Sequence, residues 1–195
     1  MTREVRGITA WNQARYRIKR PFWSVFERTF RVFTLDGQLI MLVKNPILRI
    51  RGELLVYADE GATMPLLRVK MRQIIALNYT FDVFDTATGA LLGSVQKRTV
   101  RSILRDRFLV LDPTGNEIGM MEEQGAAILR RFFPILTSRH SVLMHGQEVA
   151  RMRQIFRFFT KEFEVEIAPH QAVDPRFVLA CALLALLSEV RREDN

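Results

Sequence analysis

Most of the chain consists of short runs in which apolar and polar residues alternate, separated by glycine-containing turns. Each of five units has a β-branched or aromatic run, a turn, and a second apolar run that ends in charge. Alternation with period two between turn residues is typical of antiparallel hairpins, so the five units predict about ten strands. The turn glycines are Gly37, Gly61, Gly89, Gly115 and Gly146.

The turn sequences carry hairpin chemistry. Asp36-Gly37 predicts a two-residue hairpin, and the segment from Asp112 to Gly115 predicts a type I turn with proline in its second position. Residues 163–167 alternate strictly and add a further strand. Parallel strands would need crossover helices, for which this spacing leaves no room. The pattern therefore predicts an up-and-down antiparallel sheet large enough to close.

The C-terminal segment follows a different pattern. Asp174 and Pro175 form a helix start, with aspartate as the N-cap and proline in the first turn. Residues 177–187 are apolar on every face, so this helix must be buried all round or lie in a membrane. The run is shorter than the ~20 residues that a spanning helix needs. We therefore predict a helix over about 175–191 that threads the lumen of the barrel.

The first residues of the chain lack the repeated turn and carry aromatic residues among basic ones. We predict an N-terminal basic-aromatic arm or an added strand over residues 1–28. The barrel with its central helix is expected to occupy residues 29–192.

Three stretches follow one another in an order that has a parallel among known folds. They are residues 81–93 with 108–119, residues 146–153 leading into 163–167, and the apolar helix that begins at Asp174. This order resembles the tubby C-terminal-like superfamily, in its LURP-one-related and phospholipid-scramblase-like branch. The resemblance implies a mainly β fold, a closed antiparallel barrel of about twelve strands around a buried C-terminal helix. It also implies the absence of an enzyme active site.

Some relatives in that superfamily bind phosphoinositides or are linked to lipid scrambling. Residues 168–173 offer no run of carboxylates that could hold Ca²⁺, which argues against calcium-dependent scramblase activity.

Composition narrows the chemistry further. The chain has 29 Lys and Arg against 21 Asp and Glu, and its net charge of +8 favours anionic partners. A single cysteine excludes an intramolecular disulfide framework and a cysteine-clustered metal site. No P-loop, dinucleotide fingerprint, serine-hydrolase or zinc-protease motif is present, so we expect no enzyme, no cofactor and no metal. The chain begins without an apolar secretory segment, which predicts a cytoplasmic protein, peripheral to the membrane if it binds lipid.

The segment from Arg15 to Trp23 is the first candidate binding site. Cations mixed with interfacial aromatic residues suit anionic lipid headgroups, and they also suit single-stranded nucleic acid. The structural alternative is an arm whose aromatic residues pack on the barrel. The residues concerned are Arg15, Arg17, Lys19, Arg20, Phe22 and Trp23.

A second basic cluster comprises Arg98, Arg101, Arg105, Arg107, Arg130 and Arg131. Such cations also occur as a solvated face that keeps strand edges soluble. Two functions remain open: a non-catalytic barrel that binds anionic phospholipid at the membrane surface, and a protein- or nucleic-acid-binding regulatory module of the same fold.

Substitution Leu183→Asp tests whether the C-terminal helix is buried. A carboxylate without a partner in the core should cost most of the ~5–15 kcal/mol that stabilises a domain. Urea denaturation followed by circular dichroism measures this loss. A variant that stays folded with unchanged stability would contradict a central helix.

Overall fold

A computed structural model describes residues 11, 13–21, 29–44, 52–75, 78–99, 106–124, 139–155, 160–169 and 173–193. Within these ranges, twelve strands precede the helix α3, which spans Pro175–Glu193. The strands are β1 (Arg15–Pro21), β2 (Thr29–Thr34), β3 (Leu39–Lys44), β4 (Glu53–Tyr57), β5 (Pro65–Ile75), β6 (Asn78–Asp85), β7 (Leu91–Thr99), β8 (Asp106–Leu111), β9 (Glu117–Gln124), β10 (Arg139–Met144), β11 (Gln147–Ile155) and β12 (Thr160–Ile167).

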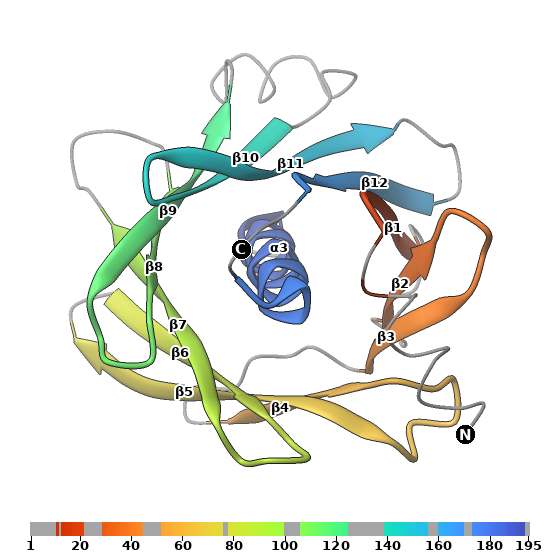
Figure 1. Cartoon of the computed structure of the whole chain (residues 1–195), viewed down its shortest axis with the longest axis horizontal. Helices are drawn as coiled ribbons and strands as arrows, with labels where there is room; N and C mark the ends of the chain where they lie inside the picture. Colours follow the sequence, from red (N-terminus) through yellow and green to blue (C-terminus); the bar gives the residue numbers. More distant parts are fainter. Residues whose placement is uncertain are drawn as a thin grey trace.

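The strands form one closed barrel in the order β1-β12-β11-β10-β9-β8-β7-β6-β5-β4-β3-β2 (Figure 1). Each strand pairs antiparallel with its neighbours in sequence, and β1 closes the ring between β12 and β2. Residues 15–21, for which the sequence left an arm or an added strand open, are part of the barrel wall. The predicted closed antiparallel barrel of about twelve strands is confirmed.

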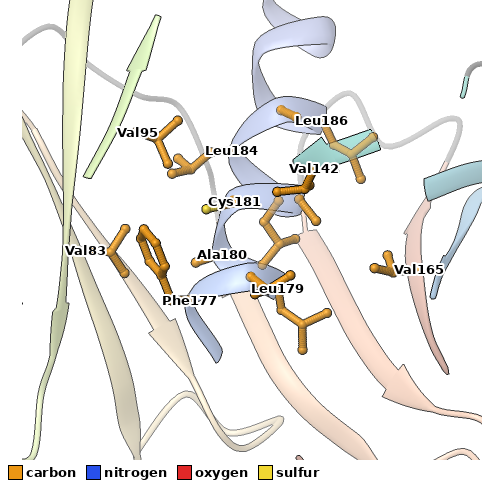
Figure 2. Close-up of a cluster of buried hydrophobic side chains, with 14 of the residues drawn as sticks. Val83, Val95, Val142, Val165, Phe177, Leu179, Ala180, Cys181, Leu184 and Leu186 are labelled. Atoms are coloured by element: carbon orange, nitrogen blue, oxygen red, sulfur yellow. The ribbon is translucent and has the colours of Figure 1, made fainter. Parts of the chain in front are cut away.

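Helix α3 lies inside the ring of strands (Figure 1). No side chain from Phe177 to Leu187 is more than 5% exposed, because strands surround the helix on every side. Figure 2 shows Phe177 beside Val83 of β6, with Val165 of β12 across the helix. The predicted buried, apolar central helix is therefore confirmed. Burial also raises the pKa of the Cys181 thiol, which disfavours the reactive thiolate.

An arginine fixes the point at which α3 enters the barrel. Arg176 Nη1 donates to Asp85 Oδ2 at 2.7 Å, and Arg176 Nη2 donates to Asp174 Oδ2 at 2.6 Å. Asp85 also accepts from the backbone N–H groups of Ala87 and Thr88 in the β6–β7 turn. Burial alone would raise the pKa of Asp85, but the hydrogen bond from Arg176 and those from the turn hold it below its usual value. The helix start is thus tied to one hairpin.

The hairpin turns confirm one detail of the sequence prediction and correct another. Gly115 N donates to the carbonyl oxygen of Asp112 at 3.0 Å, as the predicted turn requires. The prediction of a two-residue hairpin at Asp36-Gly37 was wrong. A type I′ turn needs positive φ at both central residues, whereas Asp36 does not have it, and the loop widens until Thr34 N donates to Gln38 O. The turn with two positive φ angles is His145-Gly146, at 51° and 75°.

Strand β7 comes unusually close to the helix at Gly93. A Cβ atom at this position would lie 2.5 Å from Phe177 Cζ and 2.7 Å from the carbonyl oxygen of Leu111. The backbone there also has a φ of +156°, which side-chain-bearing residues rarely adopt. The first turn of α3 can therefore pack on β7 only because residue 93 is glycine.

The substitution Gly93→Ala should destabilise the protein by ~3 kcal/mol, because Phe177 and the β8 backbone must move. A matched control is Gly89→Ala, where φ is +72° but nothing lies within 4 Å of the added Cβ. That control should lose only ~1 kcal/mol, from backbone strain. Chemical denaturation of both variants measures the difference, and equal losses would contradict the close approach of helix and strand.

Candidate functional site

A ladder of charged side chains covers the outside of β11, β12 and β1. Three glutamates on β12 lie directly across from three cations on β1, and two of them also lie across from arginines on β11. A row of carboxylates is thus flanked by cations on both sides. We call this surface the charged face; its residues are Arg151 and Arg153 on β11, Glu162, Glu164 and Glu166 on β12, and Arg15, Arg17 and Lys19 on β1.

Glu164 lies at the centre of the charged face and forms ion pairs with two arginines. Its Oε2 lies 3.3 Å from Arg153 Nη2, and its Oε1 lies 4.0 Å from Arg15 Nη1. Arg15 Nη2 also lies 3.3 Å from Glu166 Oε1. The Arg15 and Arg153 side chains remain 51% and 60% exposed. Because water competes for such pairs, each contributes at most about 1 kcal/mol to stability.

The pair of Arg17 and Glu162 differs because its carboxylate is removed from water, although the Arg17 side chain is 38% exposed. Arg17 Nε lies 2.8 Å from Glu162 Oε1, and Glu162 is only 5% exposed. A buried carboxylate is costly unless a cation compensates it. Arg17 therefore has a structural role whatever else it binds.

Of the other residues of the first candidate site, Lys19 belongs to the charged face and Arg20 does not. Lys19 Nζ stands 5.4 Å from the Phe33 ring centroid on β2. Arg20 shares the side of β1 on which Ile18 is buried, and its guanidinium carbon lies 5.9 Å from the Phe30 ring centroid. Arg20 is thus separated from the cations of the charged face. Phe22 and Trp23 lie outside the described residues.

Two members of the second basic cluster are brought together. Arg98 on β7 and Arg107 on β8 are direct partners in the strand register. The other four, Arg101, Arg105, Arg130 and Arg131, lie outside the described residues.

Arg139 on β10 is a residue that the sequence pattern does not single out. It lies directly across from Arg153 of β11, next to the charged face. In the sequence it is a cation without a basic residue two positions away, so only the register of β10 on β11 reveals its neighbourhood.

Within the described ranges, no three His, Cys, Asp or Glu residues gather in a way that could hold a metal ion. In that same part of the chain, no helix is both long enough and apolar enough to traverse a bilayer.

The model of one protein family, described as LURP-one-related, matches residues 14–185. The chain belongs to the LURP-one-related family. The match begins just before β1 and ends inside α3, so it includes β1 together with the rest of the barrel. The family indicated by the resemblance of the sequence is thus confirmed.

Among solved structures, a protein from Arabidopsis thaliana is similar to this LURP-one-related chain. The TM-score is 0.48 at 18% sequence identity, over 90% of this chain and 92% of that one. No curated protein matches the chain.

Substitution Glu162→Gln should lower the free energy of unfolding by ~2 kcal/mol, because it leaves Arg17 without its buried counter-charge. The matched control is Glu166→Gln, whose side chain is 52% exposed and should cost ~0.5 kcal/mol or less. Urea denaturation of the two variants measures the losses. A Glu162→Gln variant as stable as the control would show that Arg17 does not depend on Glu162.

Proposed function

We propose that this LURP-one-related barrel is a non-catalytic binding module that associates peripherally with anionic phospholipid on the cytoplasmic side of a membrane. The outer surface of β10, β11, β12 and β1 would make the contact. An excess of cations over carboxylates on this surface carries the proposal. Among its described side chains, six cations accompany four carboxylates: Arg15, Arg17, Lys19, Arg139, Arg151 and Arg153, with Glu148, Glu162, Glu164 and Glu166.

The packing of the barrel supports an external site. Helix α3 fills the lumen with side chains that are at most 5% exposed from Phe177 to Leu187. Many barrels of this size hold a ligand or a channel in their interior, but here the interior is core. A ligand is therefore expected on the outer surface or at the ends of the barrel.

The charge balance sets the strength of the proposed contact. Each cation held near an anionic bilayer contributes about 1 kcal/mol. An excess of two charges then gives about 2 kcal/mol, which is weaker than millimolar affinity. The association should be reversible and should weaken as salt screens it.

Sedimentation with vesicles tests the proposal. The protein is mixed with phosphatidylcholine vesicles that contain increasing fractions of phosphatidylserine, at low and at high salt. The test variant combines Arg15→Gln with Lys19→Gln, and leaves Arg17 in place because it neutralises the buried Glu162. The control combines Arg68→Gln with Lys70→Gln on β5, which also removes two charges. We expect the β1 variant to lose more binding than the β5 variant.

Three outcomes would contradict the proposal. Wild-type protein that ignores anionic vesicles at low salt would overturn a lipid function. Equal losses in both variants would show attraction to total charge, without a role for this surface. A single-stranded oligonucleotide that displaces the protein from vesicles and binds it more tightly would favour the nucleic-acid alternative.

A further inference from the structure

Two arginines face each other on the outer surface of β10 and β11. Arg139 and Arg153 are direct register partners, and Arg151 lies two residues further along β11. Like charges directly across an antiparallel pair destabilise a sheet. Cations also stand across from each other at Lys19 and Arg31 and at Arg98 and Arg107, so this pairing is informative only together with the partners of each arginine.

Arg139 differs from the other arginines whose side chains the structure describes. It is exposed, its register partner on β9 is Gln124, and no carboxylate or aromatic ring within the described residues pairs with it. Each of the others has such a partner: Arg15 with Glu166, Arg17 with Glu162, Arg20 with Phe30, Arg31 with Glu60, Arg68 with Phe84, Arg72 with Asp82, Arg151 with Glu148, Arg153 with Glu164, and Arg176 with Asp85.

Arg153 also retains binding capacity. Its partner Glu164 is shared with Arg15, and the Arg153 side chain is 60% exposed. The Arg151 side chain is 61% exposed. A guanidinium has five N–H donors, so one contact with a carboxylate leaves several free to bind an anion.

We propose that Arg139 and Arg153, assisted by Arg151, bind the phosphate of a phosphomonoester. This assignment deepens the proposed function and rests on it, since it names the anion that the surface selects. A phosphomonoester carries between one and two negative charges at neutral pH, whereas a phosphodiester carries one. Residues directly opposite in a sheet have Cβ atoms about 5 Å apart, so both guanidinium groups can reach one phosphate. Planar guanidinium groups bind phosphate oxygens in pairs, which favours the group with more free oxygens.

Vesicles of matched surface charge separate this assignment from general charge attraction. One set contains phosphatidic acid, a monoester, and the other contains enough phosphatidylglycerol, a diester, to give the same zeta potential. Wild-type protein should bind the phosphatidic acid vesicles more tightly. The variant Arg139→Gln should lose about tenfold of that binding, equivalent to one strong charge-assisted hydrogen bond. Its binding to phosphatidylglycerol should fall far less.

The control variant is Arg68→Gln on β5, which removes the same charge outside this surface and should keep the preference for phosphatidic acid. Because Arg139 is exposed and without a partner among the described residues, its substitution should leave the melting temperature unchanged. Loss of the preference without loss of stability would therefore support a binding role.

A titration with soluble phosphate esters shows whether the phosphate belongs to a lipid or to a free ligand. Calorimetric titration with glycerol 3-phosphate, and with glycerophosphocholine as the diester, shows whether a free monoester binds in an Arg139-dependent manner. Binding in solution favours a soluble ligand, and binding only to phosphatidic acid vesicles favours a lipid headgroup.

Equal binding to both vesicle types, unchanged in the Arg139→Gln variant, would overturn this assignment and leave the lipid function intact. Failure to bind either vesicle would overturn the lipid function, and Arg139-dependent binding of glycerol 3-phosphate would still support the phosphate site. Failure of all three probes would overturn both.

Discussion

The burial of an apolar helix on every side is the constraint on which the rest of this structure depends. A helix with one polar face could lie on the outside of a sheet, but residues 177–187 have no such face and are all buried. Only a closed wall can surround them, and a ring of twelve strands supplies it. The contact of Gly93 with Phe177 and the ion pairs of Arg176 with Asp85 and Asp174 fix where the helix enters.

Because α3 fills the lumen, a ligand would have to bind at the outer surface or the ends of the barrel, and the outer surface must also remain a stable sheet. Cations alone on β1 and β11 would repel one another across β12. The three glutamates of β12 divide the two cationic strands, and each carboxylate forms an ion pair with at least one arginine. Since exposed pairs contribute little stability, the main effect of this row is to limit local charge. A ligand at this face therefore meets fewer unneutralised cations than the net charge of +8 alone would suggest.

The order of the elements could be read from the sequence because it depends on local signals. Period-two alternation, turn glycines and the Asp174-Pro175 start indicate the strands and the helix, and an all-round apolar helix indicates closure. The register could not be read, because β1 and β12 meet only when the ring closes, and Arg15 and Glu166 are 151 positions apart. A basic stretch on β1 consequently suggested a free cationic site, whereas in the fold Arg15 and Arg17 are paired with glutamates and Arg20 lies over Phe30 on the other side of the strand. The prediction of a two-residue turn at Asp36-Gly37 was wrong for a different reason. The two residue types do not determine whether both φ angles become positive.

The distinction between neutralised and unneutralised cations follows from that register, and it changes which cations are available to an anionic ligand. Counting basic residues along the chain directs attention to Arg15, Arg17 and Lys19. Counting them across the strands directs attention to Arg139, an exposed arginine that has no carboxylate or aromatic partner among the described residues. On β12 every carboxylate stands between strands that carry cations, but between β10 and β11 an arginine meets an arginine. An anion bound between Arg139 and Arg153 would supply there the counter-charge that the three glutamates of β12 supply to β1 and β11.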